Sequence, residues 1–114
     1  MKKAIIDTNF IITSVKQKID FLEELNFLGI KCLIPKEVMK ELENNNAKLA
    51  LSILNSEKEK FEEIEIGSGH VDKRIIEYAK KNPKIIVATL DLEIKKAVKN
   101  NKAVINEKKR IGIL

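Results

Sequence analysis

The stretch KAIIDTNFII, residues 3–12, decides the fold that the sequence predicts. Its apolar run over residues 4–6 is typical of a short buried strand, and the run stops at Asp7, which is followed by Thr8 and Asn9. In an open parallel α/β sheet, ligands bind outside the carboxyl ends of the strands, so an acid at this point faces a crevice. Asp7 is therefore the first candidate site residue. A simple helix cap explains the same residues, because Asp, Thr and Asn all favour that position.

The composition is that of a globular protein with an aliphatic core. Hydrophobic residues make up 44% of the 114 residues and charged residues 34%, but aromatic residues only 4%, so Ile and Leu supply the packing. We expect one domain over residues 1–114. No apolar run has the length of a membrane span, and the run after the first lysines is too short for a signal peptide. We therefore expect a cytoplasmic protein that does not contact a membrane.

Neither the single cysteine nor the single histidine indicates a site of its own. Cys32 has no partner for an internal disulfide and lies in the strand-like run KCLIP, where a free cysteine packs as a small hydrophobe. His70 alone supplies neither a zinc site, which needs about four ligands, nor a hydrolytic triad.

The net charge of +5, from 22 Lys and Arg against 17 Asp and Glu, favours a polyanionic partner. The excess is small, and lysine-rich surfaces also serve solubility. The basic clusters at residues 80–81 and 108–110 are therefore interpreted as solvated faces.

Strand-like runs alternate with amphipathic helical patterns along the rest of the chain. This alternation predicts a parallel α/β sheet with right-handed crossovers. The predicted strands are 4–6, 31–34, 61–66, 84–88 and 103–105, with an apolar tail at 111–114 that can pair at an edge. The predicted helices are 11–28 as one or two helices, 36–43, 47–54 with Leu49, Ala50, Ile53 and Leu54 inward, 71–79, and 94–98.

Two of the predicted strands end in the same way, with an acid just after the apolar run. Asp7 follows the first strand and Asp91 follows the strand KIIVA, and adjacent parallel strands place such residues side by side. The helix KEVMKELE offers further acids, and Asp72 lies in the opening turn of another helix. Carboxylates that converge repel one another unless cations neutralise them. Mg²⁺ or Mn²⁺ fits best, since these ions take oxygen ligands and need no histidine.

Four segments, in this order, resemble the PIN domain: IIDTNFII, PKEVMKELE, GSGHVDKRIIEYA and IVATLDLEIKKAV. The last of these, with the following KAVINEKKRIGIL, is most similar to the small-subunit-processome and toxin-like branches of that family. The resemblance covers nearly the whole chain. It implies a three-layer α/β/α sandwich with a central, mainly parallel sheet of about five strands. It also implies a divalent-metal-dependent ribonuclease that hydrolyses RNA phosphodiester bonds.

The resemblance also implies which acids form the site. Its four acidic positions fall on Asp7, Glu41, Asp72 and Asp91, as catalytic residues and ligands of Mg²⁺ or Mn²⁺. Helical periodicity alone does not choose Glu41 over Glu43, because both flank the apolar face of their helix. The choice of Glu41 rests on the spacing found in the family.

The sequence departs from the family pattern at two positions. A frequent second acid after Asp72 is replaced by Lys73, and a frequent asparagine before Asp91 is replaced by Leu90. Neither departure removes one of the four acids, but both remove a side chain that could act as a fifth metal ligand. Glu93, near Asp91, is the remaining candidate for that role. Thr8 and Asn9 match the first motif and are expected to orient Asp7 or a bound water.

Other functions remain open at this point. A catalytically weak or inactive module for RNA binding or assembly in rRNA processing predicts binding without cleavage. A haloacid dehalogenase type of phosphatase needs a second Asp where Asn9 stands, and a response-regulator receiver needs paired acids and a late lysine, so both fit poorly. RNA is the expected partner. A homodimer, an antitoxin and a ribosome-assembly partner are further partners that the sequence leaves open.

Overall fold

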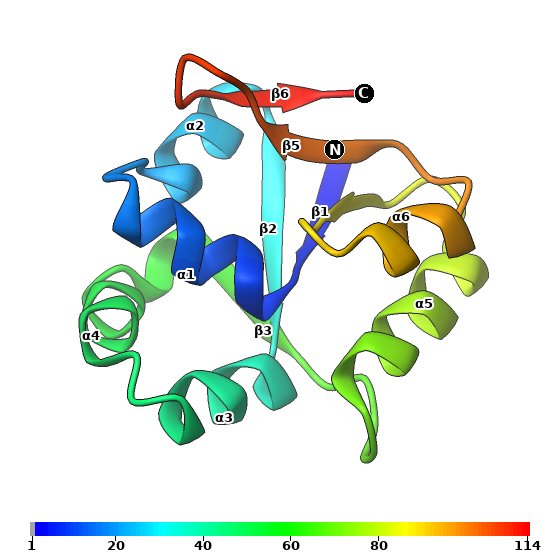
Figure 1. Ribbon diagram of the computed structural model, residues 1–114, viewed down its shortest axis with the longest axis horizontal. Helices are drawn as coiled ribbons and strands as arrows, with labels where there is room; N and C mark the ends of the chain where they lie inside the picture. The colour runs from blue at the N-terminus through cyan, green and yellow to red at the C-terminus, as the bar shows by residue number, and fades with distance from the viewer. Residues whose placement is uncertain (1) are drawn as a thin grey trace.

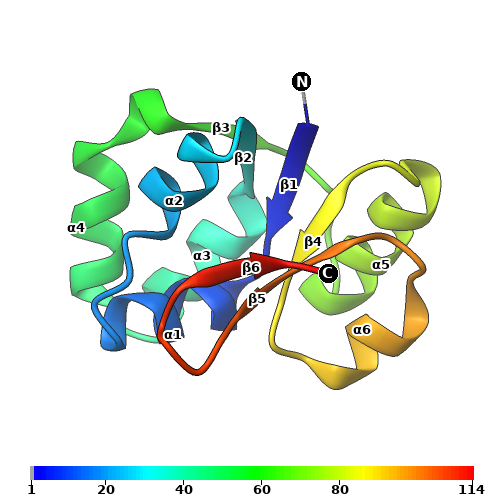
Figure 2. The same cartoon turned by 90° about the horizontal axis from the view of Figure 1, so that it is seen from above.

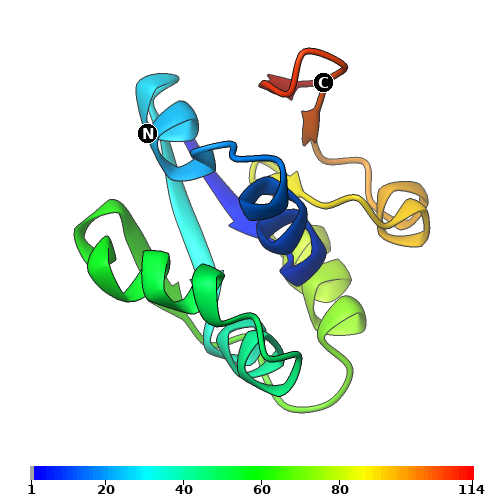
Figure 3. The ribbon, with the colours of Figure 1, turned by 60° about the vertical axis from the view of Figure 1, so that its left-hand side comes forward.

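The computed structural model describes residues 2–114. Six strands form one sheet in the order β3-β2-β1-β4-β5-β6 (Figure 1). All neighbouring strands are parallel except β6, which runs antiparallel to β5. The strands are β1 (Lys2–Ile6), β2 (Ile30–Pro35), β3 (Phe61–Ile64), β4 (Ile86–Ala88), β5 (Lys102–Ile105) and β6 (Ile111–Ile113). Figure 3 shows red β6 and orange β5 at one end of the molecule, with green α4 and β3 toward the other.

Helices cover both faces of the sheet, which gives the three-layer α/β/α sandwich expected from the sequence. The helices are α1 (Thr8–Lys16), α2 (Phe21–Phe27), α3 (Lys36–Asn44), α4 (Lys48–Ser56), α5 (Val71–Lys81) and α6 (Leu92–Ala97), with a short 3₁₀ turn, η1 (Lys58–Lys60). Helices α1 to α4 lie on one side of the strands, and α5 and α6 lie on the other (Figures 1 and 2). Right-handed crossovers from a sheet that grows first in one direction and then in the other produce this division.

The core is aliphatic, as the composition predicts. The central strand β1 contributes Ala4, Ile5 and Ile6, all with 0% exposure. Phe10 and Phe21 meet edge to face, with ring centroids 6.2 Å apart, and join α1 to α2. Cys32 is buried in β2, and desolvation raises the pKa of its thiol to about 12, so it packs as an unreactive hydrophobe. No helix within residues 2–114 has the length and apolar character needed to cross a membrane.

The apolar tail pairs at the sheet edge, as the sequence allows, and adds a sixth strand, β6, to the five predicted strands. One strand end needs correction. Strand β3 ends at Ile64, two residues before the predicted end, because its only neighbour β2 ends at Pro35, the residue paired with Ile64. Beyond that point the chain is held by Glu37, whose carboxylate accepts the backbone N–H groups of residues 66 and 67 at 3.2 Å.

Each predicted helical segment is helical in the structure, with differences in detail. The pattern over 11–28 forms two helices, α1 and α2, separated by a turn in which Lys18 has a positive φ of 60°. Leu49 was expected to face inward, but it is 65% exposed. Ala50 and Leu54 are the buried residues of α4, and successive residues of a helix are rotated by about 100°, so Leu49 lies beside this buried stripe.

Candidate active site

Asp7 stands where β1 turns directly into α1. The last residues of β1 and β4, Ile6 and Ala88, are register partners, and the Asp7 N–H donates to the Ala88 carbonyl at 2.9 Å. With φ −84° and ψ 156°, Asp7 leaves the strand in extended conformation, and its Oδ1 accepts the Thr8 N–H at 2.8 Å. Asp7 therefore caps α1, and the same geometry fixes its carboxylate at the carboxyl end of the sheet.

Thr89 ties the exit of β4 to that of β1. Its side chain has 0% exposure, and its hydroxyl donates to Asp7 Oδ2 at 2.9 Å. The hydroxyl oxygen of Thr89 also accepts the backbone N–H of Asp91, at 3.0 Å. Thr89 thus holds the Asp7 carboxylate and the backbone of Asp91 together.

Asp91 lies at the neighbouring strand end, where the strand order changes direction. In the sheet, β1 lies between β2 and β4. The chain builds the sheet outward from β1 on the β2 side first and on the β4 side later, so the exits of β1 and β4 form the crevice of this sheet. Asp91 is half-buried and caps α6, because its Oδ1 accepts the Glu93 N–H at 2.8 Å. Asp7 and Asp91 are both helix caps and neighbours at one edge, so capping and site formation coexist at these residues.

Glu41 reaches the same edge from α3. It is half-buried, and its Oε1 accepts the hydroxyl of Thr8 at 2.5 Å. Glu43, two residues later, is exposed and lies outside the cavity that Glu41 lines. The helix therefore presents Glu41 to Asp7 and turns Glu43 to solvent, a distinction that periodicity alone did not make.

Asp72 approaches from the other helical layer. It is exposed in the first turn of α5, and its Oδ1 accepts the N–H of Lys73 at 2.9 Å. His70 occupies the position before α5 without making a side-chain cap. Asp72 is the least enclosed of the four acids.

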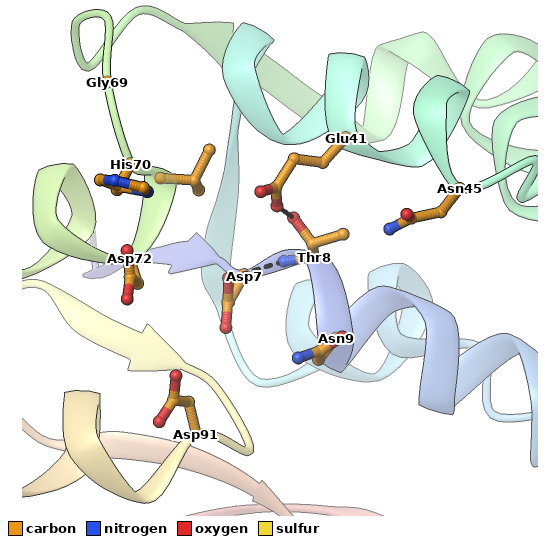
Figure 4. Close-up of a pocket in the computed structure, with 10 residues that line it drawn as sticks. Asp7, Thr8, Asn9, Glu41, Asn45, Gly69, His70, Asp72 and Asp91 are labelled. Carbon is orange, nitrogen blue, oxygen red and sulfur yellow. Dashed lines mark hydrogen bonds between the residues drawn. The ribbon is translucent and has the colours of Figure 1, made fainter.

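The four predicted acids line one cavity of about 410 Å³, called here the acid cavity. Figure 4 shows Glu41, Asp72 and Asp91 arranged around Asp7 from three different elements. Among residues 2–114, neither Lys nor Arg lines this cavity. Its lining consists of Asp7, Thr8, Asn9, Glu41, Asn45, Gly69, His70, Val71, Asp72 and Asp91.

The acid cavity lacks protein countercharge. Burial raises the pKa of Asp7 above its ordinary value of 3.8, against the lowering effect of the hydrogen bonds from Thr89 and Thr8. The carboxylates of Glu41 and Asp91 raise this pKa further. Within residues 2–114, none of the four acids takes part in an ion pair. Such a set of carboxylates favours a cation.

The donor chemistry fits a hard divalent cation. Carboxylate and amide oxygens suit Mg²⁺ or Mn²⁺, and Mg²⁺ is commonly held by only one or two carboxylates while it keeps several waters. In the described part of the chain, however, no three His, Cys, Asp or Glu side chains stand close enough together to hold one ion. Each of the four carboxylates accepts a hydrogen bond from the protein instead.

Sequence reasoning missed part of this arrangement. Thr89, a hydroxyl residue at a strand exit, received no role, although its place between the apolar run and Asp91 offered a signal. Asn45 and His70 also line the cavity, and nothing in their local sequence pointed to it. Glu93, the candidate fifth ligand, is not among the lining residues; its N–H instead serves the Asp91 cap.

Comparisons with known proteins identify the family of this fold. Residues 4–110 match the family described as a PIN like domain. The chain is 30% identical over 112 residues to ribonuclease VapC4 of Methanocaldococcus jannaschii, covering 89% of this chain and 86% of that protein. It superposes on the structure of the PIN domain endonuclease Utp24 with a TM-score of 0.81 and 28% identity, covering 98% of this chain and 92% of the other. The family match over residues 4–110, together with this sheet order and the four acids that line the acid cavity, shows that the chain belongs to the PIN-like domain family.

Proposed function

We propose that this protein is a ribonuclease that hydrolyses RNA phosphodiester bonds at the acid cavity and depends on Mg²⁺ or Mn²⁺. The observation that carries the proposal is the set of four carboxylates lining one cavity at the exits of β1 and β4, with no lysine or arginine of residues 2–114 among them. The nuclease names of the similar proteins VapC4 and Utp24 support the same class of reaction.

Each residue has a distinct part in this proposal. Asp7 and Asp91 are the principal metal ligands, since Thr89 holds the first carboxylate and the backbone of the second in fixed relation. Glu41 and Asp72, which enter from α3 and α5, hold a second ion or an ordered water. Thr8 orients Glu41 through its hydroxyl and Asp7 through its backbone N–H.

The reaction that suits these residues is in-line attack of water on a phosphodiester. A bound divalent ion supplies stabilisation of the negative charge that develops on the phosphoryl oxygens. The protein residues position the substrate and water, and the buried Asp7 keeps its carboxylate in one orientation through two hydrogen bonds.

An RNA-binding or assembly module without activity is the second candidate. The observation that favours it is the absence, within the described residues, of three acidic, His or Cys side chains close enough for one ion. The two candidates differ in one measurable property, because the module binds RNA without cleaving it. RNA as partner, a homodimer, an antitoxin or ribosome-assembly partner, and a cytoplasmic location stay proposals alongside the function.

The test of the proposed function is cleavage of single-stranded RNA by the purified protein. We expect cleavage with Mn²⁺ or Mg²⁺, its loss on chelation, and its return when the ion is restored, because the carboxylates need a cation to approach phosphate. Glu41→Gln and Glu43→Gln are matched variants on one helix. Only Glu41→Gln should reduce the cleavage rate, by about 10²-fold or more, on the scale of losing one preorganised polar contact in a site.

Two results contradict the proposal. Cleavage that survives chelation and is equal in wild type and Glu41→Gln points to a contaminating nuclease. RNA binding with no cleavage under any divalent ion supports the inactive module instead.

A further inference from the structure

A second cavity lies at the opposite end of the central strands from the acid cavity. It has a volume of about 1030 Å³ and is called here the lysine cavity. Lys2 and Lys3, at the amino end of β1, line it, whereas Asp7 follows the carboxyl end of the same strand, about 13 Å from Lys3 at the usual rise per residue. Its lining residues are Lys2, Lys3, Tyr78, Lys81, Asn82, Pro83, Lys84, Ile85 and Asn101.

Three separate elements bring lysines to this cavity. Lys2 and Lys3 come from β1, Lys81 from the last turn of α5, and Lys84 from the loop that leads into β4. In Figure 2 the start of β1 and the loop between α5 and β4 lie toward the same upper side, and both strands run downward from there. Convergence from three elements distinguishes this set from a run of lysines along one solvated face.

The lysine cavity has the opposite electrostatic character to the acid cavity. Within residues 2–114, none of its four lysines takes part in an ion pair, and no Asp or Glu lines it. Lys81 at a helix carboxyl end is favourable on its own account, because a cation there offsets the helix dipole. That effect does not apply to the other three lysines, and an anionic ligand is attracted to all four.

The loop that carries Lys84 is held rigidly beside the end of α5. Asn100 is buried, and its side-chain amide donates to the carbonyls of Ala79, Asn82 and Ile85 at 3.0 to 3.1 Å. The Asn82 side chain in turn donates to the Tyr78 carbonyl at 2.8 Å. The backbone positions of Lys81 and Lys84 are therefore set before a ligand arrives, which lowers the entropic cost of binding.

We propose that the lysine cavity binds the phosphodiester backbone of the same RNA that enters the acid cavity. The identity of this ligand rests on the proposed function. A nuclease substrate is a polyanion, and the acid cavity offers its phosphates no lysine or arginine, so the cations that hold the strand stand elsewhere. The protein measures only 31 × 30 × 25 Å, so a single extended RNA strand is long enough to reach both cavities. Tyr78, which lines the lysine cavity, adds an aromatic ring of the kind on which unpaired bases stack.

The test is the salt dependence of RNA binding, measured with chelator present so that no cleavage occurs. Fluorescence anisotropy with a labelled single-stranded RNA of about 16 nucleotides covers the usual range of site sizes for such strands. The double variant Lys81→Gln, Lys84→Gln is compared with Lys48→Gln, Lys58→Gln. The control removes the same net charge from exposed lysines of α4 and η1, which lie outside both cavities.

We expect the slope of log affinity against log salt to fall by about 1.4 in Lys81→Gln, Lys84→Gln, since each phosphate contact to a single strand contributes about 0.7. The control should keep the wild-type slope. Lys2→Gln, Lys3→Gln changes a different element and should show the same fall, which keeps the test valid if the first variant fails to fold.

Equal slopes and affinities in the cavity variants and the control overturn this inference. The same holds if the cavity variants lose binding of polyglutamate but keep wild-type RNA binding, because the site then serves an acidic peptide. These results are separable from failure of the proposed function. If RNA binds through these lysines but is never cleaved, the proposed nuclease activity is rejected and the lysine cavity remains an RNA-binding site. If RNA is cleaved in a metal-dependent way but the cavity variants and the control have equal salt slopes, the nuclease activity stands and the RNA-binding role of the lysine cavity is rejected.

Discussion

Asp7→Asn should lower the rate of RNA cleavage by about 10³-fold, because losing a principal ligand forfeits several kcal/mol of charge stabilisation in the transition state. The fold should survive this change. Asn caps helices about as well as Asp, and its amide can donate to the Thr89 hydroxyl that now donates to Asp7 Oδ2. Asp20→Asn is the matched control, because Asp20 caps α2 through the Glu23 N–H at 3.1 Å but lies outside the acid cavity.

The stability of Asp7→Asn without metal should equal or exceed that of the wild type at neutral pH. Burial raises the pKa of Asp7, so the stability that its protonated form contributes is present below pH 3.8 and is lost as pH rises through the higher folded-state pKa. Asn carries no charge and does not suffer this loss. Denaturant unfolding should therefore show a larger advantage of Asp7→Asn at pH 7 than near pH 3. A large loss of stability at pH 7 would instead make Asp7 a purely structural residue.

Asp91→Asn should remove most of the metal response of the protein. Divalent ions that bind only the folded state raise the melting temperature, and the rise shrinks when a ligand is lost. Asp7→Asn and Asp91→Asn should each reduce the Mn²⁺-induced rise. The double variant should show less than the sum of the two effects, because residues that share a ligand couple and distant caps add. Equal Mn²⁺-induced rises in wild type and both single variants would remove these two acids from the site.

The sequence predicted the parallel α/β class and the two central strands, because those strands are short apolar runs. Residues 4–6 and 85–88 are wholly apolar, and both runs emerge as buried segments of the neighbouring strands β1 and β4 or directly before them. The edge strands of the sheet were harder to predict. The end of β3 depends on the length of its partner β2, and the pairing of β6 depends on β5. The local sequence of an edge strand does not encode these relations.

The acids of the candidate site were predictable to different degrees. Asp7 and Asp91 follow from strand exits, since the pleat and the parallel register determine where those residues lie. Glu41 and Glu43 look alike in periodicity, and only the docking angle of α3 turns one toward Thr8. Thr89 escaped notice because its role is a hydrogen bond to a residue 82 positions away, which a local pattern does not encode.

The most direct test of the account is anomalous diffraction from crystals of this protein soaked in Mn²⁺. The account predicts a manganese peak inside the acid cavity, within coordination distance of Asp7 and Asp91 and lost in Asp7→Asn crystals. If the side chains of Glu41 and Asp72 also moved to the ion, the crystals would show how the four acids, which are separate in this structure, form one site. An empty acid cavity at a Mn²⁺ concentration that supports cleavage, or a peak elsewhere that persists in Asp7→Asn, would contradict the central claim.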